Sequence, residues 1–203
     1  IGGGSYGRQR YTFSSDGPLP LIPNFDYYFG VTRELTNGYR EEFDSRHAGA
    51  TITRVLAKLG YRLGENTDAS LAYTRVLDNI SQAGSLPASR LRVDRNDNLT
   101  PGDQQKDNLH QVAVNVTQKL PMGLSLALNG FFRRNDIDLF TRGLSSESEL
   151  KTATRSGGTT VQASHDSAML GKKNLLTLGL EYSRNNTHSA LDGIFLPAFT
   201  FQN

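Results

Sequence analysis

Three consecutive residues have side-chain types that could perform hydrolytic chemistry: Ser164, His165 and Asp166. A serine, a histidine and a carboxylate form the catalytic triad of many hydrolases when all three point into one site. The sequence around them alternates like a strand, and consecutive residues of a strand point to opposite faces of the sheet. The three residues therefore cannot form a triad with one another, and we predict that the protein is not an enzyme.

Metal and cofactor chemistry finds no better support in the sequence. The chain has no cysteine and only two methionines, which argues against a soft-metal centre. Gly2-Gly3-Gly4 is not followed by the Lys-Ser/Thr helix start of a phosphate-binding loop. The four histidines are widely separated and lack the spacing of a metal site: His47, His110, His165 and His188. We predict neither a metal site nor a bound cofactor.

Charged residues arranged for binding are more informative. Arg54, Lys58 and Arg62 recur every fourth residue within the strand expected at 48–63, so they share one face. A face with three cations cannot be the dry core of a soluble sandwich, but it can line a water-filled lumen. Arg54, Arg62 and Arg133, with Glu181, form either a solvated wall with ion pairs to a further part of the protein, or a surface that attracts a negatively charged ligand such as a ferric chelate.

A second group of candidate binding residues lies on polar connections between the expected strands. Binding residues concentrate on such connections, although ordinary exposed loop residues are the alternative interpretation. The complete candidate ligand-binding set is Tyr39, Arg40, Arg54, Arg90, Arg92, Arg133 and Glu181.

The elements that must position these residues are strands, and the clearest pair lies at 108–134. Val112, Val114 and Val116 alternate with polar residues, and leucines at 124, 126 and 128 do the same after the turn at 120–123. Each strand is long enough to cross a bilayer, which takes about 9–11 tilted residues. Taken alone, the hairpin also suits a soluble β-sandwich with its aliphatic face on a core. Further strands are expected at 6–15, 25–35, 68–77, 159–167 and 175–184.

Composition limits the class of protein without excluding a membrane barrel. Hydrophobic residues make up 36% of the 203 residues, and no run of about 18 apolar residues exists, which excludes a transmembrane helix. In a barrel strand only every second residue faces lipid, so the strand is less hydrophobic on average than a transmembrane helix. The net charge of +2 argues against nucleic acid as a partner.

The lengths of the connections favour the membrane interpretation. Short turns are expected near Gly17, Glu65, Pro121 and Lys172. Long loops are expected near Tyr39, Arg92, Ser145 and His188, the last two within polar connections at 135–152 and 185–203. Short turns on one rim and long loops on the other are typical of an outer-membrane barrel. We therefore predict an all-β fold, an antiparallel transmembrane β-barrel with the outer-membrane lipid around it.

Several stretches, taken in order, resemble the first part of the barrel of a TonB-dependent outer-membrane receptor. They are Gly4-Ser5-Tyr6-Gly7, Gly17-Pro18-Leu19, Asp26-Tyr27 with Val31-Thr32-Arg33 and Asn37-Gly38-Tyr39-Arg40, and Lys58 to Leu63 with Asp68-Ala69-Ser70-Leu71. Such receptors have a plug domain inside a 22-stranded barrel and import scarce nutrients, often ferric siderophores. The resemblance implies a bacterial outer-membrane location, contact with lipopolysaccharide, a ferric chelate as ligand, and coupling to TonB through the plug.

The chain also departs from that family pattern. It shows no plug domain and no TonB box, and Phe201 is followed by Gln202-Asn203 instead of ending in an aromatic residue. We therefore expect residues 1–203 to be a fragment, about eight or nine strands of a larger barrel that begins after the plug. The alternative is a complete eight-stranded outer-membrane barrel with a structural or adhesive role. The residues do not indicate which ligand is bound.

Overall fold

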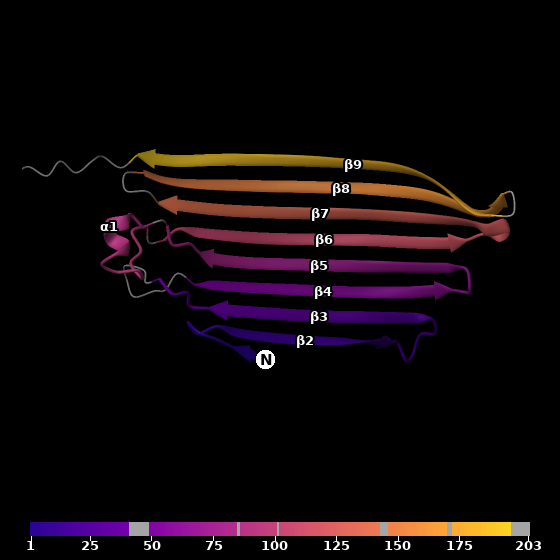
Figure 1. Cartoon of the computed structure of the whole chain (residues 1–203), viewed down its shortest axis with the longest axis horizontal. Helices are drawn as coiled ribbons and strands as arrows, with labels where there is room; N and C mark the ends of the chain where they lie inside the picture. The colour runs from indigo at the N-terminus through magenta and orange to yellow at the C-terminus, as the bar shows by residue number, and fades with distance from the viewer. Residues whose placement is uncertain (41–48, 85, 101, 143–145, 170–171, 196–203) are drawn as a thin grey trace, which may run out of the picture.

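The computed structural model describes residues 1–40, 49–84, 86–100, 102–142, 146–169 and 172–195. Nine antiparallel strands form one sheet in which each strand pairs with its neighbours in the sequence (Figure 1). A single short helix, α1 (Ala88–Leu91), and a 3-10 turn at Pro121–Gly123 are the helical elements described. The strands are β1 (Gly2–Gly3), β2 (Gln9–Pro18), β3 (Phe25–Thr36), β4 (Ala50–Leu63), β5 (Thr67–Ser81), β6 (Gln104–Lys119), β7 (Leu124–Arg142), β8 (Ser146–Met169) and β9 (Lys172–Phe195).

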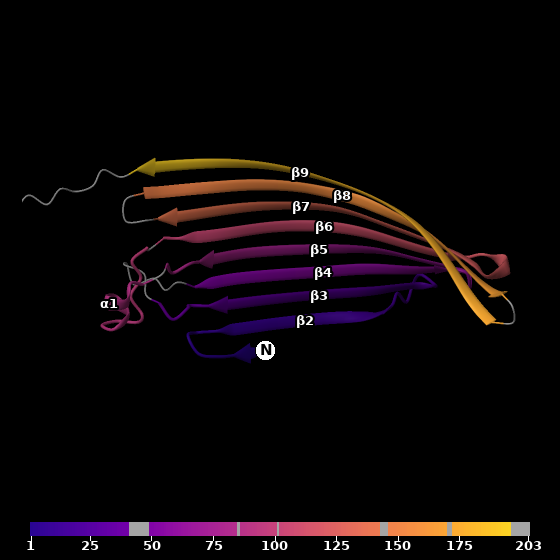
Figure 2. The same cartoon turned by 45° about the horizontal axis from the view of Figure 1, so that its top comes forward.

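The sheet is a single curved layer with two free edges (Figure 2). No hydrophobic side chain is buried anywhere in the described ranges, so no second layer closes a core over either face. The first and last strands do not pair with each other. This open arrangement argues against a complete eight-stranded barrel, and the missing core argues against a soluble sandwich. Within the described ranges, no helix combines the length and the apolar character needed to cross a membrane.

Strand register assigns the two faces as the alternation predicted. Leu59 on β4 pairs with Leu71 on β5, and Leu71 pairs with Val114 on β6. In the same way, Tyr61 on β4 is connected to Leu128 on β7 through Ala69 and Val116. Cross-strand partners share a face, so all seven residues expected to face lipid lie on one side: Leu59, Tyr61, Val114, Leu126, Leu128, Leu178 and Leu180. We call this side the outer face. The residues expected to face the lumen lie on the opposite, inner face: Lys58, Arg62, Asn115, Asn129, Thr177 and Glu181.

The turns between strands reveal how the sheet is tilted. Pro18, the last residue of β2, is connected through successive cross-strand partners to Thr160 on β8. β8, however, continues to Met169, nine residues beyond Thr160. At ~3.3 Å per residue and ~4.8 Å per strand, this stagger over about six strand steps corresponds to a tilt of about 45°. That tilt is typical of transmembrane barrels.

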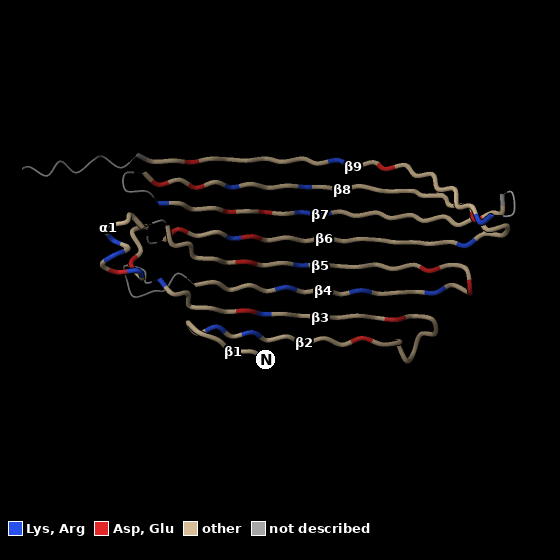
Figure 3. Tube along the Cα trace, viewed as in Figure 1, with Lys and Arg blue, Asp and Glu red and all other residues tan. Residues whose placement is uncertain are grey.

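The same geometry fixes the height of the apolar band on the outer face. On β7 the band begins at Leu124 and is ended by Arg134, ten residues later. With ~3.3 Å per residue and a tilt of ~45°, this distance measures about 23 Å along the membrane normal, close to the ~25 Å band of outer-membrane barrels. On β5 to β8, charged residues gather towards one end of the strands, and a stretch almost free of charge follows (Figure 3).

The two ends of the strands form two different rims. The turns after Pro18, Leu63 and Lys119 lie at one end, the right of Figure 1, together with the end of β8 and the start of β9, and we call this end the turn rim. The residues between β5 and β6, with α1, lie at the other end, which we call the loop rim. The predicted separation of short turns from the loop carrying Arg92 is therefore confirmed.

Two predicted long connections are wrong. Residues 135–142 continue β7, β8 already begins at Ser146, and residues 185–195 continue β9 past His188. These strands rise beyond the apolar band, where both faces are wetted, so polar side chains there do not interrupt pairing. Ser145 and the predicted loop end at 196–203 lie outside the described residues.

The first predicted strand is also displaced. β2 begins at Gln9, not at residue 6, and continues through Pro18, past the expected short turn near Gly17. Proline is compatible with this position because β2 has a partner on only one side there, so its missing N–H is not needed.

Candidate ligand-binding site

Two segments of the loop rim are joined by hydrogen bonds. The Arg40 guanidinium, which follows β3, donates to the backbone carbonyl of Gly84, which follows β5. The Gly84 N–H donates to the Thr100 hydroxyl at 3.0 Å, and the Thr100 N–H donates to the side-chain carbonyl of Asn98 at 3.1 Å. Arg40 therefore fastens the end of β3 to the long β5–β6 connection.

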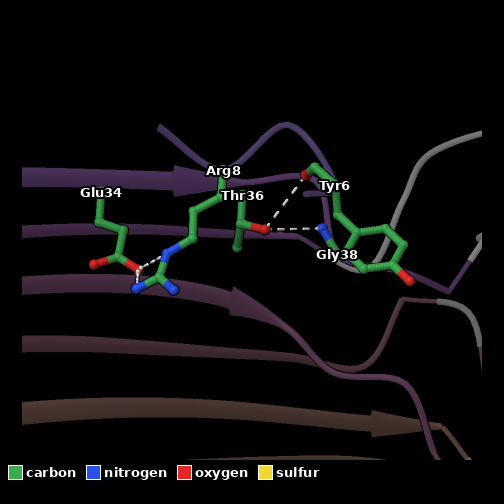
Figure 4. A network of polar contacts seen from close by, with 5 residues as sticks. All are labelled: Tyr6, Arg8, Glu34, Thr36 and Gly38. Carbon is green, nitrogen blue, oxygen red and sulfur yellow. Dashed lines mark hydrogen bonds and ion pairs between the residues drawn. The ribbon is translucent and has the colours of Figure 1, made fainter. Parts of the chain in front are cut away.

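The turn between β1 and β2 is also held against the end of β3 by hydrogen bonds (Figure 4). The Asn37 N–H donates to the Tyr6 carbonyl at 2.9 Å, and the Thr36 hydroxyl lies 3.5 Å from the same oxygen. The Gly38 N–H donates to the Thr36 hydroxyl at 3.2 Å. Arg8 and Glu34 form an ion pair at 2.7 Å beside this turn. The backbone around Tyr6 is thus held against the end of β3.

These contacts bring two tyrosines and an arginine together at the loop rim. The Tyr6 and Tyr39 rings lie edge to face with their centroids 6.1 Å apart, and the Arg40 guanidinium lies 5.5 Å from the Tyr39 ring centroid. Tyr6 and Tyr39 remain 62% and 52% exposed, so both phenol rings are open to a ligand. Aromatic rings beside a guanidinium suit a flat or anionic ligand, because the rings stack and the cation attracts charge. We call Tyr6, Tyr39 and Arg40 the tyrosine–arginine cluster.

Arg90 and Arg92 lie elsewhere on the loop rim. Arg90 belongs to α1, and its guanidinium is 3.8 Å from the Asp97 carboxylate. Arg92 is the exposed residue that ends α1. Within the described ranges, no hydrogen bond or ion pair connects either arginine with Tyr39 or Arg40. The structure places all four candidates on one rim but brings only Tyr39 and Arg40 into contact.

The remaining candidates lie on the inner face, spread over several strands. Arg54 on β4 is opposite Thr32, Arg133 on β7 is opposite Gln111, and Glu181 lies on the edge strand β9. They therefore share the lumen wall without forming one cluster. Nearer the turn rim, Arg62 pairs with Asp68 at 3.0 Å. A hollow of ≈ 430 Å³ lies there, lined on the inner face by Asp26, Lys58, Arg62 and Asp68.

Sequence reasoning missed the residues that hold the rim in place. Tyr6 was not a candidate, because nothing local indicates that it meets Tyr39, 33 residues later. Asn98 and Asp103 are the polar residues that anchor the β5–β6 connection, and both are buried. The Asp103 carboxylate accepts a hydrogen bond from the Arg142 N–H, and its backbone carbonyl accepts one from the Gln82 N–H at 2.7 Å. The Asn98-x-Thr100 spacing, which favours a local side-chain turn, was the available signal.

No family model and no curated protein matches the sequence. The structure, in contrast, superimposes on solved receptor structures. The unliganded ferric citrate transporter FecA gives a TM-score of 0.84 at 13% identity, with 97% of this chain and 29% of FecA covered. The siderophore receptor PiuA from Acinetobacter baumannii gives 0.76 at 14% identity, with 92% and 30% covered. The ferripyoverdine receptor of the Pseudomonas aeruginosa outer membrane gives 0.74 at 12% identity, with 99% and 28% covered.

This chain has the fold of part of an outer-membrane receptor barrel. The predicted fold class, an antiparallel transmembrane β-barrel present in part, is thereby confirmed, and the family resemblance holds at the level of the fold. The chain spans less than a third of the length of each of these proteins. All three are transporters or receptors rather than enzymes.

Proposed function

We propose that this chain is one part of the barrel of a bacterial outer-membrane receptor that imports a negatively charged ferric chelate. The observation that carries the proposal is the tyrosine–arginine cluster, whose two phenol rings are exposed at the loop rim of a sheet whose inner face bears cations. A ligand arriving from outside would meet Tyr6, Tyr39 and Arg40 first. The barrel fold is shared with a ferric citrate transporter, a siderophore receptor and a ferripyoverdine receptor.

Three cations of the inner face could attract an anion that enters the lumen. Arg54, Lys58 and Arg133 lie on that face, and none of them forms an ion pair within the described part of the chain. Cations on the low-dielectric wall of a lumen raise the local concentration of anions and speed their entry. Arg92 adds positive charge at the rim where the ligand enters, whereas Arg90 is paired with Asp97.

The two free edges of the sheet indicate that further strands are needed to form a stable barrel. In a bilayer, each unpaired backbone group costs several kcal/mol, so only a closed barrel is stable there. We infer that residues 1–203 are a fragment that closes with further strands of the same protein. In this proposal a plug domain fills the lumen, and TonB supplies the energy for import through that plug.

The proposal is tested on the full-length parent protein, with ferric citrate as an anionic probe and a neutral ferric hydroxamate for comparison. Tyr39→Ala and Arg40→Gln should each weaken ferric citrate binding about tenfold, because each removes a stacking or charged contact of about 1–1.5 kcal/mol. The matched control is Arg95→Gln, an exposed cation of the same rim without an ion pair in the described part of the chain. The control should change binding by less than about twofold.

Two results would contradict the proposal. One is that the intact protein binds and imports neither chelate, or prefers the neutral one. The other is that Arg95→Gln weakens binding as much as Arg40→Gln, which would mean that overall charge, and not the cluster, attracts the ligand.

A further inference from the structure

A row of basic residues crosses four neighbouring strands on the outer face. Arg75 on β5 pairs with His110 on β6, His110 pairs with Arg134 on β7, and Arg134 pairs with Arg155 on β8. Cross-strand partners have Cβ atoms about 4.5–5.5 Å apart, so the three guanidinium groups and the imidazole lie side by side. We call these four residues the basic row. They are far apart in the sequence, and only the strand register places them together.

The basic row marks the upper border of the apolar band. The row directly below it, towards the turn rim, consists of Tyr73, Val112, Phe132 and Gly157. Below these follow the aliphatic residues of the band, such as Val114 and Leu128. The row therefore lies at the level of the lipid headgroups in the leaflet on the loop-rim side, which in this orientation is the external leaflet.

The protein itself leaves much of this charge uncompensated. Arg134 pairs with Asp136 at 2.8 Å, and His110 shares a hydrogen bond of 2.8 Å with the Tyr73 hydroxyl. Arg75 and Arg155 have no ion pair in the described ranges, and the Arg75 Nε is buried without a hydrogen-bond partner. Like charges placed directly opposite each other destabilise a sheet, so this row gains stability from an external anion.

A second row on the same face shows the contrasting arrangement. Four residues further up each strand, Lys106 pairs with Asp138, and Asp138 pairs with Lys151. Here the signs alternate, and Lys151 also contacts Glu149 at 2.9 Å. In this upper row a carboxylate lies between the two cations, whereas no carboxylate lies within the basic row. On β5 to β8, the row of like charges thus lies at the height of the lipid phosphates.

We propose that the basic row binds the headgroup of an external-leaflet lipid that carries two phosphate groups. Arg75 holds one phosphate and Arg134 with Arg155 holds the other, while the acyl chains pack against Tyr73, Val112 and Phe132 below. The distance from β5 to β8 is about 14 Å at ~4.8 Å per strand, which separates the two positions. Guanidinium groups bind phosphate through two parallel hydrogen bonds, which an ammonium group cannot do. The inference rests on the membrane-spanning fold and does not require that the protein imports a ferric chelate.

The test measures lipid retention by the purified full-length protein in an uncharged detergent. The probe is bis-phosphorylated lipid A, compared with the same lipid after removal of both phosphates, and native mass spectrometry counts the bound molecules. The wild-type protein should prefer the phosphorylated lipid by at least about tenfold, since each basic residue near a membrane surface contributes about 1 kcal/mol. Arg134→Gln/Arg155→Gln should lose most of this preference.

The matched control removes two cations from the charge-alternating row, Lys106→Gln/Lys151→Gln, and should change retention by less than about twofold. Equal losses in both double variants, or equal binding of both lipids by the wild type, would overturn the proposal. Heat-modifiable gel mobility verifies that each variant is folded. If the double variant fails to fold, the single variant Arg155→Gln, on an exposed side chain, should still reduce retention about threefold. Ferric citrate binding by the same variants should be unchanged, so failure of this inference is distinguishable from failure of the import proposal.

Discussion

The assignment of the two faces is most sharply tested at two consecutive residues, Leu128 and Asn129. Both lie in the part of β7 that crosses the apolar band and at nearly the same height, but Leu128 belongs to the outer face and Asn129 to the inner face. We expect Leu128→Arg to destabilise the folded barrel strongly and Asn129→Arg to have little effect. In the first variant the new charge meets lipid, and in the second it meets the water-filled lumen.

The size of the effect follows from the depth of Leu128. It lies four residues above Leu124, or about 9 Å along the membrane normal at ~3.3 Å per residue and ~45° tilt. The band is about 23 Å tall by the same measure, so Leu128 lies close to the bilayer midplane. An arginine there costs about 2–4 kcal/mol in transmembrane barrels, against about 0–1 kcal/mol near the interfaces. A value of ~3 kcal/mol corresponds to a change of more than a hundredfold in the folding equilibrium.

The assay is denaturant unfolding of the full-length parent protein in phospholipid vesicles, followed by heat-modifiable gel mobility. Leu128→Ala is included to separate the loss of apolar contact from the cost of the charge, and it should cost less than Leu128→Arg. The reasoning is refuted if Asn129→Arg is as destabilising as Leu128→Arg. It is also refuted if Leu128→Arg costs less than about 1 kcal/mol, since Leu128 would then face water.

Three further outcomes are expected. An isolated 1–203 polypeptide should aggregate or stay unfolded in detergent, because both edges of its sheet are unpaired; a stable monomer with β-sheet circular dichroism would contradict this. In intact cells, an impermeant thiol reagent should label Val93→Cys at the loop rim and not Asn66→Cys at the turn rim, and the reverse pattern would invert the orientation. Asp103→Ala should raise hydrogen exchange at the Arg142 amide by an amount equivalent to about 1–3 kcal/mol, because that N–H loses its buried acceptor. Asp103→Asn, which keeps a carbonyl oxygen, should show the smaller effect, and unchanged exchange in both variants would show that the bond does not hold the connection.

The alternation of side chains by itself determined which residues face lipid. Leu59, Val114 and Leu128 could be assigned from the sequence because lipid lies on one side of the strand and water on the other, which enforces a period of two. The same reasoning failed at 135–142 and 185–195, where the strands rise out of the membrane. There both faces are wet, the period disappears, and polar strands cannot be distinguished from loops without their pairing partners.

Only the tertiary structure decided which distant residues meet. The contact of Tyr6 with Tyr39 depends on where the β1–β2 turn lies against the end of β3, which no local pattern specifies. The basic row depends on the register of four strands, and a shift of any strand by one residue would move its member to the other face. Register is set by the fit of whole apolar faces and by the turns between strands. The sequence therefore contained the charges, and the pairing of the strands gathered them into sites.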